Sequence, residues 1–163
     1  MTRLSIPVIV ALLLSACAAP RPANQVPSFY RSMASANAVI DSATAADMFS
    51  SYRRNKRLGA LTVDPELTAI AEAEADAMAG SDKPASADAV KARLAAAGFI
   101  APAANLSAGY HTLAEAFSGW RESAQHDRVL LDPRATRMGI ATAYTPNSKY
   151  KVYWVLVVAS GKR

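Results

Sequence analysis

The side chains best suited to chemistry gather in one stretch of the chain, from Ala104 to Asp132. This stretch holds both histidines, His111 and His126, and it places Glu122 and Ser123 just before the second histidine. A histidine beside a carboxylate or a hydroxyl can act in general acid–base or nucleophilic catalysis. The chain lacks the Gly-x-Ser-x-Gly elbow of serine hydrolases and the His-Glu-x-x-His of zinc proteases, so neither class of enzyme is predicted.

A helix predicted over residues 112–123 positions these groups. Thr112 and Glu115 fit a capping box at its start, where each side chain accepts a hydrogen bond from a free backbone amide. The apolar face follows the helical spacing i, i+3, i+4 and i+7, at Leu113, Ala116, Phe117 and Trp120. If the helix continued further, Glu122 would approach His126 and raise its pKa, which would make the histidine a poorer base.

Three more helices are predicted upstream. The first is expected to begin at Thr44 and to end before Gly59. The second opens at Asp64-Pro65, with Asp64 as the N-cap and the proline at the first helical position. Ser86 is expected to cap the third helix, which ends at Gly98.

Two strands are predicted near the C-terminus, over residues 137–144 and 150–160, and a shorter extended segment is expected at residues 106–110. The strand at 150–160 is apolar on both faces, so it should lie centrally with helices on both sides. Helices before and between strands predict an α/β fold, a three-layer α-β-α sandwich around a small, largely antiparallel sheet. Trp120 and Trp154 are expected to be core residues.

The N-terminus predicts a bacterial lipoprotein. A basic residue and a short apolar segment precede Leu14-Ser15-Ala16-Cys17, which has the pattern of a lipobox. Residues 1–16 would be the signal peptide, residues 17–43 a lipidated tether and weakly structured linker, and residues 44–163 the folded domain. Acyl chains on Cys17 would anchor the protein in the membrane. Ala18 favours the outer membrane, with the domain facing the periplasm.

Composition and charge limit the classes of partner. The only cysteine is Cys17, so no disulfide can form within the chain. The densest basic run, Tyr52–Arg57, is interpreted as a solvated helix face, with contact to anionic lipid or peptidoglycan as the other interpretation. Aromatic and basic residues do not alternate as they do on nucleic-acid-binding surfaces, so no nucleic acid is predicted. The seven glycines are isolated, which excludes a glycine-rich phosphate loop, and no cofactor is predicted.

Several short motifs follow one another in order between residues 44 and 160. They are Arg57-Leu58-Gly59, Arg93-Leu94, Ala97-Gly98-Phe99, Asn105-Leu106-Ser107-Ala108-Gly109, Trp120-Arg121-Glu122-Ser123, His126, Met138-Gly139-Ile140 and Tyr153-Trp154. In this order and spacing they resemble the CAP superfamily, also called the SCP or cysteine-rich secretory protein, antigen 5 and pathogenesis-related 1 family. The match is to its short bacterial forms without disulfides. The resemblance implies an α-β-α sandwich, in agreement with the pattern of predicted elements.

Many members of that family bind a divalent metal between two histidines and two glutamates. By the resemblance, His126 takes the place of the second histidine, but Ala104 stands where the motif glutamate belongs, and residues 80–86 contain no histidine. A zinc-like site needs three or four ligands around one point, so no metal is predicted. The residues left to line a ligand-binding cleft are His126, Asn105, Ser123, Glu122 and His111.

These observations lead to the hypothesis of an envelope-anchored CAP-domain lipoprotein that binds a ligand and catalyses no reaction. The expected ligand is a lipid, a peptidoglycan fragment or an envelope protein. One alternative is a divergent hydrolase in which His126 acts beside Glu115, Glu122 or Asp127. Another is a passive structural lipoprotein, because a fold does not by itself specify a function.

Overall fold

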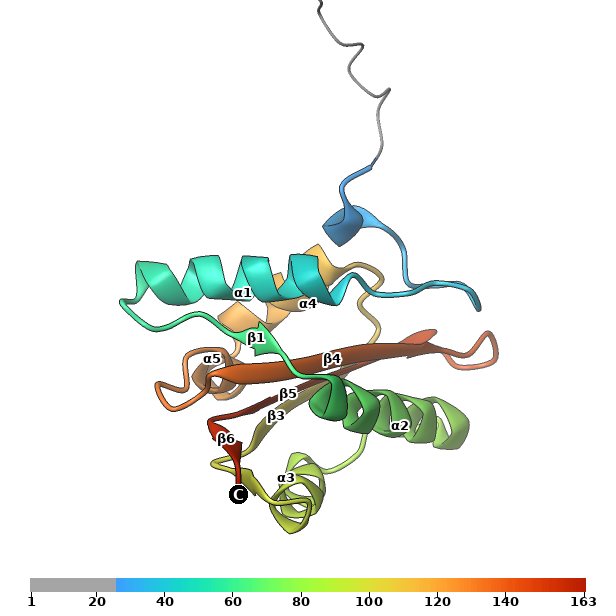
Figure 1. The fold of residues 1–163 in the computed structure, drawn as a ribbon. Helices are drawn as coiled ribbons and strands as arrows, with labels where there is room; N and C mark the ends of the chain where they lie inside the picture. Colours follow the sequence, from blue (N-terminus) through green and yellow to red (C-terminus); the bar gives the residue numbers. More distant parts are fainter. Residues whose placement is uncertain (1–25) are drawn as a thin grey trace, which may run out of the picture.

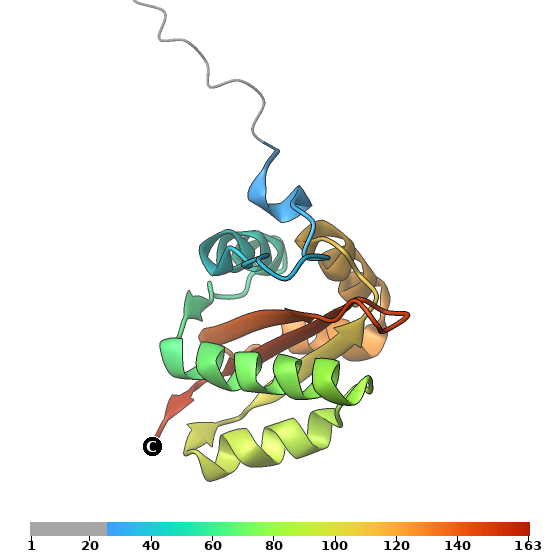
Figure 2. The same ribbon diagram turned by 90° about the vertical axis from the view of Figure 1, so that its right-hand side faces the viewer.

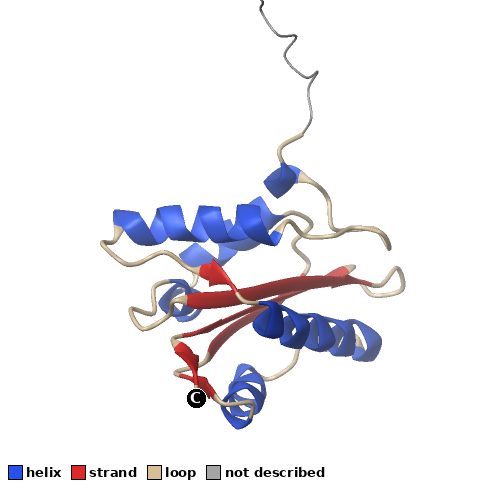
Figure 3. Ribbon diagram, in the orientation of Figure 1, coloured by secondary structure: helices blue, strands red, loops and turns tan. Residues whose placement is uncertain are grey.

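The computed structural model describes residues 26–163, so the predicted signal peptide and Cys17 lie outside the described residues. The described chain forms three layers, with a sheet between two sets of helices (Figure 1). Helices α1 and α4 cover one face of the sheet, and α2 and α3 cover the other (Figure 2). The predicted α-β-α sandwich is therefore confirmed, and Figure 3 shows the strands enclosed between the helices.

The predicted helices and strands are present in the predicted order, together with elements that were not predicted. The longer helices are α1 Ser42–Asn55, α2 Pro65–Ser81, α3 Ala87–Ala96, α4 Leu113–Glu122 and α5 Ala124–Leu130, preceded by a 3-10 turn, Ser28–Tyr30. The strands are β1 Thr62–Val63, β2 Phe99–Ile100, β3 Ala103–Ala108, β4 Arg137–Tyr144, β5 Val152–Ala159 and β6 Gly161–Lys162. Helix α5 and the two-residue strands were not expected. Within residues 26–163, no helix is long and apolar enough to cross a membrane.

The main sheet has the strand order β1-β4-β5-β3, in which only the β1–β4 pair is parallel. Every residue of β5 is buried, which confirms that this strand is central and covered on both faces. Strands β2 and β6 form a separate antiparallel pair. Strand β3 and most of β4 are therefore the two edges of the main sheet, and each edge borders a groove.

Alternate residues of the strands supply two separate cores. On the α1 and α4 side, Trp120 and Trp154 are fully buried and meet edge to face, with ring centroids 6.3 Å apart. On the α2 and α3 side, the core consists mostly of alanine, valine and leucine residues, such as Ala141, Val155 and Leu94. Both tryptophans are core residues, as predicted.

The helix starts follow the expected capping chemistry, with one correction. Asp64 caps α2 by accepting hydrogen bonds from Glu66 N and Leu67 N, and Arg137 Nη1 binds its other oxygen at 2.9 Å. The capping box of Thr112 and Glu115 is present at α4. Helix α1, however, begins before Thr44, because Asp41 accepts a hydrogen bond from the backbone amide of Thr44. A carboxylate at this position satisfies a free amide of the first turn, so the helix starts two residues earlier.

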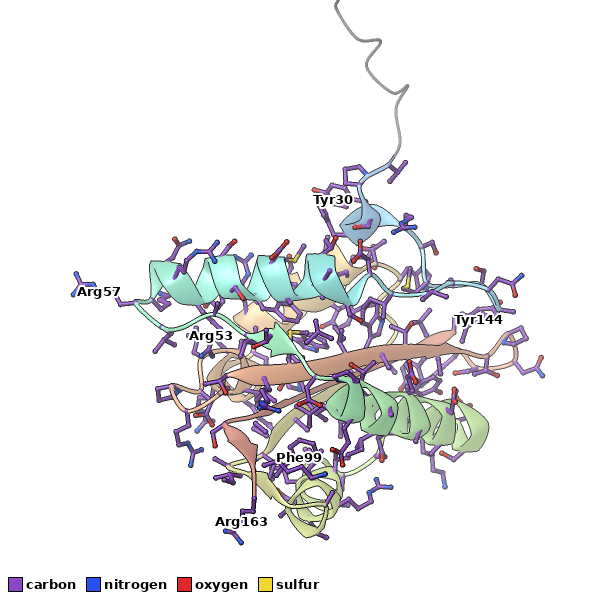
Figure 4. All side chains as sticks on the ribbon, viewed as in Figure 1. Tyr30, Arg53, Arg57, Phe99, Tyr144 and Arg163 are labelled. Atoms are coloured by element: carbon purple, nitrogen blue, oxygen red, sulfur yellow. The ribbon has the colours of Figure 1, made fainter. Side chains whose placement is uncertain are left out.

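The basic run at the end of α1 is only partly a solvated face. Arg57 points outward at the end of the helix, whereas Arg53 lies beneath α1 and is completely buried (Figure 4). Its guanidinium donates hydrogen bonds to four carbonyl oxygens, those of Gly59, Leu130, Asp132 and Ala135. Arg53 therefore joins α1 to the end of α5 and the loop that follows it. The interpretation of this residue as a solvated cation was wrong.

Candidate functional site

A groove of about 470 Å³ lies along the free edge of β3, between the start of α3 and the outer side of α5. Ala103 and Ala104 of β3 line it at the position where the family resemblance expects a glutamate. The remaining lining residues are Ser86, Ala87, Asp88 and Lys91 from α3 and its cap, and Gln125, Arg128 and Val129 from α5. Because a methyl group stands in place of a carboxylate, the floor of the groove offers backbone and methyl groups only.

The charged residues at the groove are two cations and one anion. Lys91 and Asp88 lie one turn apart on α3 and pair with each other at 2.6 Å. This hydrogen bond, followed by the lysine charge, lowers the pKa of Asp88. Arg128 on the opposite wall donates through Nε to Ala124 O at 3.0 Å, which leaves its terminal amino groups to face solvent. The groove therefore presents one cation without a carboxylate partner among residues 26–163.

The chain bends between α4 and α5 at Ser123. Its φ of −95° and ψ of 113° are extended, so α4 ends there and α5 begins. Ser123 is half-buried, and its carbonyl accepts the first hydrogen bond of α5, from Asp127 N at 2.8 Å. The bend also separates Glu122 from His126. Glu122 is exposed, and no ion pair joins the two residues in the described part of the chain.

His126 is half-buried on α5, beside the groove and not among its lining residues. Burial lowers the pKa of His126, the opposite of the shift expected from a pairing with Glu122. No hydrogen bond or ion pair involves its imidazole within residues 26–163. The Asp127 carboxylate beside it accepts a hydrogen bond from the Tyr52 hydroxyl at 2.9 Å instead. No described carboxylate orients this imidazole as a general base requires.

Asn105 connects the sheet to α5. It is completely buried on β3, and its Nδ2 donates to the backbone carbonyl of His126 at 3.0 Å. Asn105 Oδ1 has no hydrogen-bond partner among residues 26–163. The two candidate residues are thus brought together, through the main chain of His126 and not its imidazole. Asn105 positions the α5 wall of the groove.

His111 lies away from the other candidates. It precedes α4 and is exposed, and its backbone amide donates to Glu115 Oε2 at 2.6 Å within the capping box. Its carbonyl accepts a hydrogen bond from Met33 N at 2.7 Å. His126 follows the opposite end of α4, and a ten-residue helix is about 15 Å long. The two histidines therefore belong to different surfaces.

No group of three or more His, Cys, Asp or Glu side chains within residues 26–163 is arranged to hold a metal ion. None of the five predicted cleft residues lines the groove, and its polar lining residues, Ser86, Asp88, Lys91, Gln125 and Arg128, were not predicted as site residues. The signal for the last two was the spacing of Gln125, Arg128 and Val129, at i, i+3 and i+4. It becomes visible only when residues 124–130 are known to form a helix.

Comparison with known proteins agrees with the fold. Residues 46–158 match the model of the cysteine-rich secretory protein family, CAP. An extracellular SCP-domain protein of Bacillus anthracis str. Ames has a similar structure, with a TM-score of 0.61 and 20% identity over 73% of this chain and 40% of that one. A cysteine-rich secretory protein of Staphylococcus aureus subsp. aureus Mu50 gives a TM-score of 0.59 and 19% identity over 73% and 38% of the two chains.

An outer surface protein of Borrelia burgdorferi is also similar, with a TM-score of 0.63 and 16% identity over 77% of this chain and 98% of that one. The chain spans about two fifths of the length of the Bacillus and Staphylococcus proteins. No curated protein matches the chain. At these identities the structural likeness shows a shared fold.

Proposed function

Because the chain belongs to the CAP, or cysteine-rich secretory protein, family, we propose that it is a non-enzymatic binding protein of the bacterial cell envelope. The observation on which this rests is the groove at β3, which has charged and polar walls but neither a histidine nor a glutamate among its lining residues. Ala104 lines it where a glutamate would stand, and the imidazole of His126 lies outside its lining. The extracellular and outer-surface relatives support a location outside the cytoplasm.

The chemistry of the groove favours a peptidoglycan fragment over a lipid chain. Acyl chains bind in sites lined mostly by apolar side chains. Here the walls carry Ser86, Lys91, Gln125 and Arg128, and the apolar groups are mainly alanine methyls. Peptidoglycan stems combine carboxylates with amides, and arginine binds carboxylates with paired hydrogen bonds. Arg128 is the residue we expect to contact a stem carboxylate.

Reversing the charge of Arg128 is expected to weaken binding to peptidoglycan. The full-length protein in detergent would be mixed with insoluble peptidoglycan, and the retained fraction measured against concentration. Arg128→Glu should raise the apparent Kd by about tenfold, because it replaces an attraction for the stem carboxylate with a repulsion. Arg54→Glu is the matched control, since Arg54 is an exposed arginine on α1 whose side chain hydrogen-bonds only to Ser51 among residues 26–163.

The control separates the groove from general surface charge. Equal weakening by Arg54→Glu and Arg128→Glu would mean that net charge, and not the groove, governs retention. Absence of retention for the unsubstituted protein would contradict a peptidoglycan ligand. Vesicles of neutral phospholipid provide the comparison for lipid: binding to them that requires Arg128 would assign the groove to a lipid instead.

Anchoring at Cys17 is the second part of the proposal. The motif Leu14-Ser15-Ala16-Cys17 supports cleavage before the cysteine and acylation of its thiol. Several acyl chains on one residue hold a protein on a membrane far more firmly than one chain does. The outer membrane, with the domain in the periplasm, is the location that Ala18 favours.

The Cys17→Ser variant is expected to lose the lipid and to remain uncut. Cells producing the full chain would be fed an alkyne-labelled fatty acid, and the protein would be purified and tested for label. Because Cys17 is the only cysteine, no other thiol can carry the label. Absence of label on the unsubstituted protein would rule out acylation, independently of the result with peptidoglycan.

A further inference from the structure

The outer edge of β4 is unpaired along most of its length. Strand β1 pairs with it only through Thr62–Val63, opposite Arg137 and Met138. Beyond Met138, no backbone hydrogen bond joins this edge to any other segment between Val26 and Arg163. An unpaired strand edge offers a row of N–H and C=O groups to which another extended chain can add.

The direction of the unpaired backbone N–H and C=O groups follows from the hydrogen bonds at the start of β4. Asp64 N donates to Met138 O, so Met138 directs its backbone groups outward, toward β1. Backbone groups alternate in direction along a strand, so those of Ile140, Thr142 and Tyr144 also point outward. Ile140 is buried, while Thr142 and Tyr144 are half-buried. The accessible part of the edge is therefore the stretch around Thr142.

The sequence of this edge lacks the residues that usually hinder pairing. Exposed edge strands commonly carry lysine, proline or a bulge, which hinder the addition of a further strand. Residues 139–144 read Gly-Ile-Ala-Thr-Ala-Tyr, without a charge or a proline. The strand also pairs with β5 in continuous register from Arg137 to Tyr144, without a bulge.

A groove of about 240 Å³ runs along this unpaired edge. One wall is the segment that leads into α1, and the other is α2, which contributes Glu72. In the first wall Val39 is 78% exposed, the highest value among the large apolar residues that the structure describes. Glu72 is exposed and makes no ion pair within residues 26–163. The groove thus combines free backbone groups, an apolar side chain and a single negative charge.

We propose that this groove binds an extended, basic segment of a partner protein, which adds to the sheet as a strand beside β4. The partner's main chain would pair with the free groups of Thr142 and Tyr144, as in other cases of strand addition. An apolar side chain of the segment would contact Val39. A lysine or arginine of the segment would pair with Glu72, and this charge complementarity is the reason for assigning a basic occupant.

The same carboxylate argues against a second copy of this chain. Two copies pairing about a two-fold axis near Thr142 would bring Glu72 of each copy to the same interface. Like charges that meet in an interface weaken it. The groove is therefore matched to a segment of opposite charge and not to its own copy.

The test uses the full-length protein and a fluorescent synthetic peptide of alternating valine and lysine, with binding followed by fluorescence anisotropy. Thr142→Pro should weaken binding about tenfold, because proline removes the central N–H donor of the edge. Its N–H makes no ladder bond in the free protein, and edge strands tolerate proline at such positions. Glu72→Lys should weaken binding of this peptide about fivefold, and strengthen binding of a valine–glutamate peptide.

Asp76→Lys is the matched control, because Asp76 is an exposed acid one turn further along α2 and does not line the groove. Weakening by Glu72→Lys but not by Asp76→Lys supports the proposal, even if Thr142→Pro fails to fold. Equal effects of both lysine variants would overturn it. So would full binding by a folded Thr142→Pro protein, or no binding by the unsubstituted one. A dimer in size-exclusion chromatography that Thr142→Pro dissociates would assign the edge to a second copy instead.

Discussion

Replacing Gly139 with alanine is expected to destabilise the protein by about 3 kcal/mol or more, the upper range for overpacking a close-packed interior. A Cβ atom at Gly139 would lie 2.2 Å from the carbonyl carbon of Leu67 and 2.4 Å from Thr68 N. Carbon atoms in contact normally lie about 3.5–4.0 Å apart. These contacts are with the backbone of α2, so no side-chain rotation can relieve them. The helix would have to move away from β4.

The movement would affect more than one contact. Helix α2 is held at its start by Asp64, whose amide donates to Met138 O and whose carboxylate binds Arg137. Both partners lie on β4, next to Gly139. Displacing α2 therefore strains its N-cap as well as the core that it shares with Ala141. Urea denaturation followed by circular dichroism would measure the loss as a lower midpoint.

Two other glycines provide controls for this prediction. At Gly80 in α2 a Cβ meets nothing within 4 Å, so Gly80→Ala should stabilise the protein by up to about 1 kcal/mol. At Gly119 the nearest atom is Tyr110 Oη, at the far end of a half-buried side chain that can turn away. Gly119→Ala should therefore cost less than Gly139→Ala. An unchanged unfolding midpoint for Gly139→Ala would mean that α2 does not approach β4 as closely as the structure shows.

The fold was predictable where periodicity and capping agree. Strand β4 covers the predicted residues 137–144, and Asp64 and Thr112 cap the helices that they were expected to cap. Helix α5 was missed because seven residues between two other signals give too little periodicity. Strand β1 has two residues and exists only through its pairing with β4, a contact that no local pattern contains.

The candidate site was predicted less completely than the fold. Ala104, which the family resemblance placed where the motif glutamate belongs, lines the groove at β3. The other residues that line that groove could not be predicted from the sequence, because they come from separate helices. Lys91 and Arg128 lie on helices on opposite sides of the β3 edge. His111 and His126 are close in sequence, yet α4 holds them at opposite ends. Sequence proximity overestimates spatial proximity when a helix intervenes.

Replacing Arg53 with methionine is expected to destabilise the protein by about 3–5 kcal/mol, because buried carbonyl oxygens would lose the donors that satisfy them. Three of the carbonyl oxygens that now accept from the guanidinium, at 2.7–2.9 Å, would lose their donor, whereas Asp132 O would keep the amide of Ala135. The methionine side chain is similar in length to the arginine side chain, but it donates no hydrogen bond. Each buried acceptor left without a donor costs about 1–3 kcal/mol before the surroundings relax.

Arg53→Lys should recover little of this loss. Burial lowers the pKa of the Arg53 guanidinium, and the nearby Asp132 charge opposes this shift. A lysine ammonium is a compact charge with three donors, so it cannot reach four carbonyls arranged around a planar fork. In chemical denaturation, the free energy of unfolding of Arg53→Lys should therefore be close to that of Arg53→Met. Arg54→Met, one residue further along α1 and exposed, should change the free energy of unfolding by less than about 0.5 kcal/mol.

The loss of Arg53 should destabilise α5 and the loop after it more than it destabilises the rest of the domain. Two of its acceptors, Leu130 O and Asp132 O, end α5 and begin the next loop, and α5 forms one wall of the groove at β3. In Arg53→Lys, backbone amides of residues 124–131 should exchange with solvent faster than those of β5 under native conditions. Uniform acceleration across α5 and β5 would show that Arg53 stabilises the whole domain equally and has no special part in holding the groove.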